Sequence, residues 1–266
     1  MTWTPTICEA RSVVRRVLIA LLAVLLVAPA AEATAHPAPT RPVESGDDGA
    51  SAEPKQTQAP TPVTLGGVRV RLRAGTRQVV TVNHQDGHHA RVSYWVLRGA
   101  DWQRRLTAVD GRIGYGGLVA PTRREQGTGT TPLGTYGLVS AFGMHAESDR
   151  WQLRYREVRR GDYWVQDNGS DFYNRYRNKR QGGFRWWLPS SDENSSERLL
   201  DYRGQYEWAI VMDFNRDQVR RRGSGIFLHV NGSGATAGCV SAPRRFVRKL
   251  MVRLDRERVP VIAVGR

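Results

Sequence analysis

The sequence predicts a mainly β fold, in which one domain of about 200 residues is built from packed sheets with few helices. Two observations carry this prediction. From about Val68 onward, short runs alternate β-branched or aromatic residues with arginine or polar residues, which is the pattern of strands with one buried face. Only residues 243–256 have the spacing of an amphipathic helix. The sequence contains neither an internal repeat nor a heptad pattern.

The first 35 residues have the pattern of an export signal. Arg11, Arg15 and Arg16 precede the apolar run VLIALLAVLLVAPA, and Ala33 and Ala35 offer an A-x-A cleavage site. The apolar run is shorter than the roughly 20 residues that span a bilayer. We therefore expect a cleaved signal peptide over residues 1–35, with an uncleaved anchor as the alternative, and a protein exported to the cell wall or the extracellular space without a transmembrane span after cleavage.

Residues 36–65 contain six prolines and few large apolar side chains. Such a segment buries too little surface to offset the entropy of ordering, so we expect a disordered linker over 36–65 and a folded domain over 66–266. The chain carries a formal charge of +15, to which residues 1–35 contribute +1 and the linker −2, so the predicted domain carries +16. In an exported protein this charge favours an anionic cell wall or anionic lipid headgroups over nucleic acid as partner, and a solvated basic surface without a dedicated partner is the alternative.

The predicted strands follow one another along the domain. They occupy residues 68–74, 77–83, 90–99, 206–215 and 259–265. Asp86-Gly87, between the second and third of these runs, is a strong hairpin turn signal. The run at 225–230 is continuously apolar except for His229, which predicts a strand buried on both faces with His229 near its end.

The helix predicted over 243–256 has apolar side chains at i, i+1, i+4, i+5 and i+8, counted from Phe246. Ser241 is the expected N-cap, because its hydroxyl can accept a hydrogen bond from a first-turn amide. Pro243 is tolerated in a first turn.

Once the signal peptide with Cys8 is removed, Cys239 is the only cysteine. A single thiol in an oxidising compartment is buried, paired between molecules or used chemically, and the cysteine alone leaves these possibilities open. The surrounding residues favour chemistry. Gly238 permits a tight turn whose backbone N–H groups can face a substrate carbonyl. His229, ten residues earlier, can supply the base that an ordinary thiol needs at neutral pH.

The region GIFLHVNGSGATAGCVSAP resembles the catalytic core of the L,D-transpeptidase (YkuD-type) enzymes, in which a strand ends in His, a variable loop follows and an S-x-G-C turn carries the nucleophile. The segment 117–138 is similar to the glycine-rich G-x-T-P-x-G-x-F/Y segment of that family. The stretch YWVQDNGSDFYN is similar to an aromatic-Asp-Asn stretch of an exported, actinobacterial-like branch. The three matches occur in the family's order within residues 105–266.

The resemblance implies a β-sandwich-like L,D-transpeptidase catalytic domain that cross-links peptidoglycan stem peptides through a thioester on Cys239. His229 would be the general base, and the amides of Gly238 and Cys239 would be the oxyanion donors. The implied chemistry needs neither a metal nor a cofactor. An L,D-carboxypeptidase, with water as the acceptor, would use the same groups, and a non-catalytic basic cell-wall-binding module is a further alternative.

Two departures from the family pattern affect substrate recognition. Ala237 stands where a second His is common, and Ser241 stands where many members have an Arg that is linked to the substrate carboxylate. Arg244 or Arg245 is a candidate replacement. The candidate substrate-binding residues are Thr236, which falls where the family usually has Ser, and Asp167, Tyr173 and Asn174.

Two other groups of polar residues are more typical of ordinary turns than of metal-binding sites. His84, His88 and His89 flank the hairpin turn without Cys or Glu in ligand spacing. The segment 213–218 begins like a calcium loop but lacks the glycine at its sixth position. Five aromatic residues have two possible roles, packing in the core or lining a groove for glycan or peptide. They are Trp164, Tyr173, Trp186, Trp187 and Tyr206.

Overall fold

The computed structural model describes residues 62–266. The predicted signal peptide, and the predicted linker up to residue 61, lie outside the described residues. The last four residues of the predicted linker form strand β1 (Pro62–Leu65), which pairs with β2 (Val68–Arg71) in an antiparallel hairpin. The folded domain therefore begins before residue 66, because β1 has a neighbouring strand to pair with.

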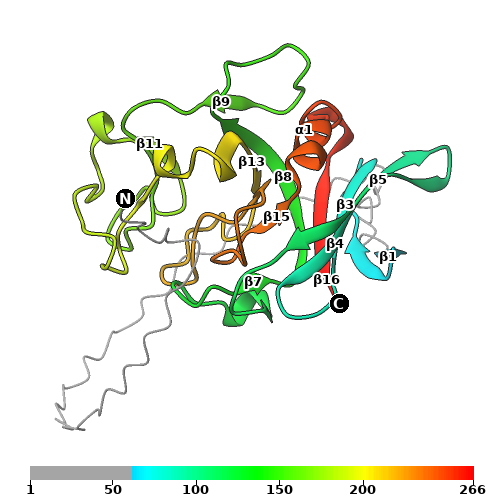
Figure 1. The fold of residues 1–266 in the computed structure, drawn as a ribbon, viewed down its shortest axis with the longest axis horizontal. Helices are drawn as coiled ribbons and strands as arrows, with labels where there is room; N and C mark the ends of the chain where they lie inside the picture. Colours follow the sequence, from blue (N-terminus) through cyan, green and yellow to red (C-terminus); the bar gives the residue numbers. More distant parts are fainter. Residues whose placement is uncertain (1–61) are drawn as a thin grey trace, which may run out of the picture. The chain divides into compact units, whose positions relative to one another are not determined.

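The main sheet closes on itself. Its strands are β3 (Gln78–His84), β4 (His89–Arg98), β5 (Asp101–Arg112), β8 (Gly134–Gly143), β9 (Tyr155–Glu157), β13 (Trp208–Met212), β14 (Phe227–Val230), β15 (Val240–Ala242) and β16 (Val261–Gly265). They follow the order β13-β14-β15-β5-β4-β3-β16-β8-β9, and β13 also pairs with β8, so all of these strands except β9 form a barrel-like ring (Figure 1). The prediction of a mainly β domain with few helices is confirmed.

The hairpin signal at Asp86-Gly87 is confirmed. β3 and β4 pair in register from Gln78 to His84, and the amide of His89 donates to Asp86 O at 2.8 Å across the turn. Gly87 has a φ of +52°, in the left-handed region that glycine adopts without strain. The alternation of this part of the sequence thus predicted both strands and their connection.

Apolar side chains divide between the two faces of the ring. One large cluster includes Ile210 and Leu228. Helix α1 (Arg244–Met251) packs on this cluster with its own apolar stripe. The opposite face of β13 and β14 carries a second cluster with Ala209 and Phe227. The β1–β2 hairpin contributes to a third, separate cluster.

The helix is shorter than predicted. α1 ends at Met251, and although Leu254 is fully buried it lies in the turn that follows. Ser241 is not the N-cap, because it belongs to β15, and the N-cap position is Pro243 without a side-chain hydrogen bond. The helix can begin only after β15 has ended at Ala242, a constraint that the local sequence does not reveal.

A small sheet lies beside the second cluster. Strand β10 (Asp162–Trp164) pairs with β11 (Tyr176–Asn178) and with β12 (Glu197–Arg198). The ring of Trp164 packs against Phe227, with the ring centroids 4.8 Å apart, so this sheet covers the outer face of β14. Figure 1 shows β11 and β1 on opposite sides of the barrel.

The remaining elements are short. They are β6 (Leu118–Val119), β7 (Thr131–Pro132) and the 3-10 helices η1 (Pro121–Arg123), η2 (Lys179–Gln181), η3 (Leu199–Tyr202), η4 (Gln205–Glu207) and η5 (Arg256–Arg258). Across residues 62–266, every helix is too short or too polar to cross a bilayer.

Candidate active site

His229 and Cys239 belong to neighbouring strands. His229 lies in β14, Cys239 immediately precedes β15, and the two strands are parallel with His229 paired to Ser241. Because side chains alternate along a strand, Phe227, His229, Cys239 and Ser241 project from the same face. This is the face that the small sheet covers, so the imidazole and the thiol share one environment.

His229 is held as a neutral base. Its ring is 1% exposed, and Nδ1 lies 2.8 Å from Val230 O, to which it donates, so the lone pair resides on Nε2. Nε2 is buried and has no hydrogen-bonding partner among the described residues. Burial lowers the pKa of His229 to about 4, against a smaller opposing effect of the hydrogen bond to Val230. The ring of Tyr206 packs edge-on against the imidazole at a centroid distance of 5.4 Å.

Cys239 lines a cavity of about 130 Å³ and is 5% exposed. Its thiol donates to Gly225 O at 3.2 Å, and Sγ accepts from the amide of Phe227 at 3.4 Å. The sulfur is therefore directed at the start of β14, while His229 lies two residues beyond Phe227 on the same face. Transfer of the thiol proton to Nε2 requires the sulfur to turn away from Gly225, an adjustment that often accompanies substrate binding.

The turn before Cys239 has little room for any residue but glycine at position 238. Gly238 has a φ of +127°, and an added Cβ would lie 2.8 Å from both Arg124 Nη2 and Thr130 O. Thr236 braces the turn, because its hydroxyl donates to Cys239 O at 2.6 Å and accepts from the amide of Gly238 at 3.2 Å. An oxyanion would thus compete with the Thr236 hydroxyl for the amide of Gly238.

The glycine-rich segment 117–138 packs against this turn. The hydroxyl of Thr131 donates to Gly238 O at 2.8 Å and accepts from the amide of Gly114 at 2.8 Å. The amide of Tyr115 donates to Thr236 O at 2.9 Å. Two segments far apart in the sequence thus form one wall of the cavity.

Arg124 is a residue of this wall that the sequence analysis missed. It is buried and lines the same cavity as Cys239. Its Nε donates to Thr130 O at 2.9 Å and its Nη1 donates to Arg222 O at 3.0 Å. No carboxylate of residues 62–266 forms an ion pair with it. Burial lowers the pKa of Arg124, and the charge of Cys239 opposes that change, so the cation favours a thiolate beside it.

Glu197 is a second cavity residue that the sequence analysis missed. It lines the cavity of Cys239 and also a neighbouring cavity of about 240 Å³. Its Oε1 accepts a hydrogen bond of 2.6 Å from the hydroxyl of Tyr206, the residue that contacts His229. Burial raises the pKa of Glu197 to about 7, despite the opposing effect of the Tyr206 hydrogen bond. The polar run around residue 197 gave no signal that distinguished this carboxyl.

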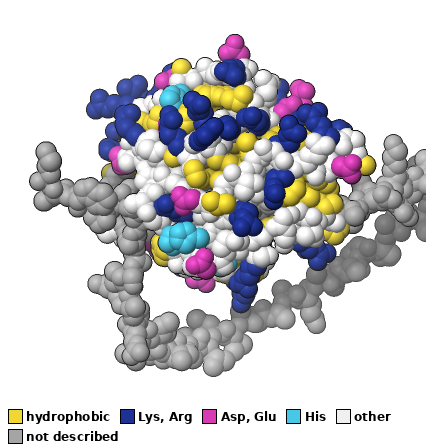
Figure 2. All heavy atoms as spheres, turned by 45° about the vertical axis from the view of Figure 1, so that its right-hand side comes forward, with side chains coloured by type: hydrophobic (Ala, Val, Ile, Leu, Met, Phe, Trp, Pro, Cys, Tyr) yellow, Lys and Arg dark blue, Asp and Glu magenta, His cyan; other side chains and the backbone are white. Residues whose placement is uncertain are grey.

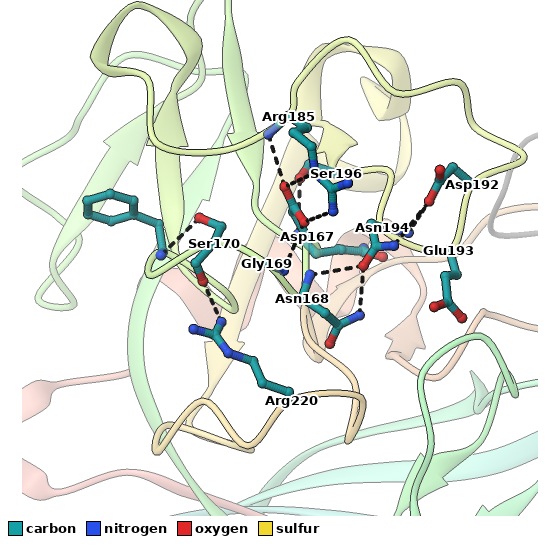
Figure 3. Close-up of polar contacts among 12 residues, drawn as sticks. Asp167, Asn168, Gly169, Ser170, Arg185, Asp192, Glu193, Asn194, Ser196 and Arg220 are labelled. Carbon is teal, nitrogen blue, oxygen red and sulfur yellow. Dashed lines mark hydrogen bonds and ion pairs between the residues drawn. The ribbon is translucent and has the colours of Figure 1, made fainter.

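Asp167, a predicted substrate-binding residue, is instead hydrogen bonded within its own loop and to the loop that carries Arg185 (Figure 3). Its carboxylate forms a bidentate pair with Arg185, at 2.5 and 2.9 Å, and accepts from the amide of Gly169. The side-chain hydrogen bond from Arg185 is the main reason that the pKa of Asp167 is lowered. Nearby, Asn194 accepts from both the amide and the side chain of Asn168 (Figure 3).

Tyr173 and Asn174 are also satisfied within the protein. The hydroxyl of Tyr173 donates to Gln126 Oε1 at 2.7 Å. Asn174 Oδ1 accepts from Trp164 Nε1 and from the amide of Gly225, each at 3.0 Å. Since Gly225 O in turn accepts from the Cys239 thiol, Asn174 helps to fix the position of the residue whose carbonyl accepts from the sulfur. Like Asp167 and Thr236, these two residues do not line the cavity at Cys239.

The two arginines considered as replacements for the family arginine lie elsewhere. Arg244 forms a bidentate ion pair with Glu207, with both N–O distances 2.5 Å, and neither Arg244 nor Arg245 lines the cavity. Ser241 is fully buried, and its hydroxyl has no hydrogen-bonding partner among the described residues. Arg124 is the arginine that lines this cavity.

The five aromatic residues separate into two groups. Trp164, Tyr173 and Tyr206 are buried, as core packing predicts. Trp186 and Trp187 are 39% and 63% exposed, and Trp186 lines the second cavity. Trp186 and Trp187 therefore keep the groove interpretation by their exposure, and Tyr206, although buried, lines the cavity at Cys239.

Within residues 62–266, no three His, Cys, Asp or Glu side chains are grouped as a metal site. The chain matches no protein-family model, no curated protein and no solved structure.

Proposed function

We propose that the domain is a cysteine acyltransferase that cross-links peptidoglycan stem peptides, as an L,D-transpeptidase does. The observation that carries the proposal is a grouping at one site: the cavity-lining thiol of Cys239, the neutral imidazole of His229 on the same face, and the guanidinium of Arg124 without a carboxylate partner. A buried cation and an unpartnered ring nitrogen are both costly to a fold. The cation favours the ionised sulfur that nucleophilic catalysis needs, and the free lone pair of the imidazole is available to accept the proton of the thiol during the reaction.

In the proposed first half-reaction, His229 Nε2 takes the proton of the thiol, and Sγ attacks an amide carbonyl of the donor stem. The hydrogen bond from Nδ1 to Val230 O keeps the tautomer that leaves Nε2 able to accept this proton. Arg124 stabilises the thiolate. The tetrahedral intermediate then expels D-alanine, whose amine receives the proton from His229, and Cys239 is left as a thioester.

In the proposed second half-reaction, a side-chain amine of another stem attacks the thioester carbonyl and restores the thiol. If water attacks instead, the enzyme is an L,D-carboxypeptidase, and analysis of the products distinguishes the two. We propose that the exported domain acts at the anionic cell wall. Figure 2 shows Lys and Arg side chains spread over the visible face of the domain, in keeping with attraction to an anionic polymer.

The proposal is tested by incubating the protein with a tetrapeptide stem and measuring its intact mass. We expect an adduct equal to the stem without its terminal D-alanine, located on Cys239. Cys239→Ser keeps nearly the same shape and should form no adduct, while His229→Gln should form it at least about a hundredfold more slowly. Glu257→Gln, a surface change, is the control and should react like the natural protein.

An adduct on another residue would contradict the assignment of Cys239. Absence of any adduct, with wall binding that is equal in the natural protein and in Cys239→Ser, would instead favour the non-catalytic wall-binding module. Release of free tripeptide without cross-linked product in the presence of acceptor stems would favour the carboxypeptidase.

A further inference from the structure

Glu197 lies in the wall between two cavities. The cavity that contains Cys239 and the neighbouring cavity of about 240 Å³ have four lining residues in common, Gln166, Ser190, Ser195 and Glu197. Glu197 is the only ionisable side chain of these four. An acyltransferase with two substrates needs room for an acceptor beside the acylated nucleophile, and the second cavity provides such room on the far side of this carboxyl.

The carboxyl of Glu197 has no cationic partner among the described residues. The adjacent Arg198 pairs with Asp201 instead, with Nε 2.7 Å from Oδ1. The hydrogen bond that Glu197 accepts comes from the neutral hydroxyl of Tyr206. A partly buried carboxylate with one neutral donor lacks the counter-charge that such groups usually have.

The first cavity has one further polar group without a partner among the described residues, the hydroxyl of Ser224. This residue is 8% exposed. Tyr206 connects Glu197 to His229, because it hydrogen bonds to the carboxyl and packs against the imidazole. The carboxyl and the thiol thus line one cavity, and the imidazole lies behind the ring of Tyr206, which is part of the same lining.

We propose that Glu197 binds the primary amine of the acceptor, which enters through the second cavity, and removes a proton from it when it attacks the Cys239 thioester. This inference rests on the proposed function. The ammonium group gives one proton to the Glu197 carboxylate, and the neutral amine forms a C–N bond to the acyl carbon. The C–S bond then breaks, the sulfur leaves as a thiolate, and the second amine proton passes to His229 Nε2.

The carboxyl is suited to this step. A lysine-type amine has a pKa near 10.4 in water, so transfer to an ordinary carboxylate crosses a gap of about six pKa units. Because burial raises the pKa of Glu197 to about 7, the gap falls to about three. Burial of the ammonium group in the cavity lowers its own pKa and narrows the gap further. At neutral pH a substantial fraction of Glu197 is still ionised and able to accept the proton.

The charged groups near the carboxyl come from several elements. Asp201 raises the pKa of Glu197, and the hydrogen bond from Tyr206 lowers it. The other charged side chains that line the two cavities are Arg124, Asp192, Glu193 and Arg198. In the lining of the second cavity Arg198 and Asp201 form an ion pair, so the Glu197 carboxylate supplies the remaining charge and favours a cationic amine over an anionic ligand.

The test measures how much of the acyl-enzyme reacts with an amine acceptor and how much is hydrolysed by water. The protein is acylated with a tetrapeptide stem, and Nα-acetyl-lysine amide is supplied as the acceptor at several concentrations. For Glu197→Gln we expect acylation within about twofold of the natural rate, at least a tenfold loss of aminolysis, and hydrolysis within about twofold. Glu125→Gln makes the same chemical change on an exposed residue outside both cavities and should leave all three rates unchanged.

Tyr206→Phe distinguishes two roles of Glu197, accepting a proton from the amine and holding Tyr206 in place. Removing this hydroxyl raises the pKa of Glu197 further, so the pH midpoint of aminolysis should move upward while the maximal rate is largely kept. If Tyr206→Phe instead abolishes aminolysis without a change of midpoint, Glu197 acts only by holding Tyr206, and the proposal is overturned. An equal loss of acylation and aminolysis in Glu197→Gln would overturn it as well.

Binding gives an answer that does not depend on acylation. Nα-acetyl-lysine amide is titrated into Cys239→Ala at pH 8 by ligand-observed NMR, with and without Glu197→Gln. We expect the second change to weaken binding at least tenfold, and the ε-hydroxyl analogue of the ligand to bind weakly to both. If no acyl-enzyme forms with the stem but the amine still binds through Glu197, the transpeptidase proposal fails and the amine site stands. Equal binding with and without the Glu197 carboxyl would contradict the proposal that Glu197 forms an amine-binding site.

Discussion

The site makes a specific prediction about stability and pH, because two of its groups have pKa values displaced in opposite directions. Burial lowers the pKa of His229 from 6.5 to about 4 and raises that of Glu197 from 4.5 to about 7. Each displacement is worth about 3 kcal/mol at about 1.4 kcal/mol per pKa unit. For His229 the stability is complete above pH 6.5 and is lost as the pH falls toward 4, because the unfolded chain binds the proton first.

For Glu197 the sign is opposite. The folded state binds its proton more tightly than the unfolded chain, so this carboxyl lowers the free energy of unfolding as the pH rises from 4.5 to about 7. Between pH 4.5 and 6.5 both groups lower the free energy of unfolding, and their opposite pH dependences cancel, so their sum does not vary with pH. Glu197→Gln removes one of them, so the variant should equal the natural protein near pH 4 and exceed its stability by about 3 kcal/mol at pH 7.5.

The assay is urea unfolding from pH 4 to pH 8, with Glu125→Gln as the matched control. The informative quantity is the difference between the free energies of unfolding of variant and natural protein at each pH, because all other titrating groups cancel in that difference. We expect the difference to rise with a slope near 1.4 kcal/mol per pH unit between pH 4.5 and 7 for Glu197→Gln, and to stay near zero for the control. A difference that does not vary with pH would refute the assignment of a displaced pKa to this carboxyl.

Three further predictions concern the thiol and its supports. Arg124→Met should slow alkylation of Cys239 by iodoacetamide at pH 7 by about tenfold, because the cation that favours the thiolate is lost, and Arg124→Lys should retain part of the rate. Asn174→Ala should lower the free energy of unfolding by about 2 to 4 kcal/mol in urea titrations, since it leaves buried donors without their acceptor, the amide of Gly225 among them. Gly238→Ala should cost about 1 to 3 kcal/mol by the same assay and slow alkylation as well, because its Cβ would lie against Arg124 at a φ of +127°.

The sequence was informative where a function depends on neighbouring positions. His229 and Cys239 are joined by a short loop between parallel strands, so their shared face follows from strand alternation and register. The glycine at 238 was predicted as a turn residue for the reason observed, a backbone conformation that favours glycine. Strands β3 and β4 were predicted to within one residue at each end, whereas the predicted runs 68–74 and 206–215 extend beyond β2 and β13.

Arg124 and Glu197 could not be predicted in this way. Arg124 lies about 115 residues before Cys239 and reaches the turn only because the glycine-rich segment folds back over it. The position of Glu197 is set by the pairing of β12 with β10, which the polar sequence around Glu197 does not predict. The same sequence features that suggested substrate contacts at Asp167 and Asn174 are those of residues that brace loops, because carboxylate and amide side chains serve both purposes.

The charges of the site also explain why its groups are placed on the outer face of the barrel. The inner face is filled by a continuous apolar cluster, where an arginine without a carboxylate partner and a carboxyl without a cation would have no access to solvent or substrate. Beneath the small sheet, Arg124 and Glu197 instead line a cavity that also contains the thiol. Each of these two groups lacks the partner that would stabilise it, and the substrates of the proposed reaction supply both kinds of partner, a carboxylate or thiolate for the guanidinium and an amine for the carboxyl. The fold is therefore less stable alone than it would be with its charges paired, and its stability should increase when both substrates are bound.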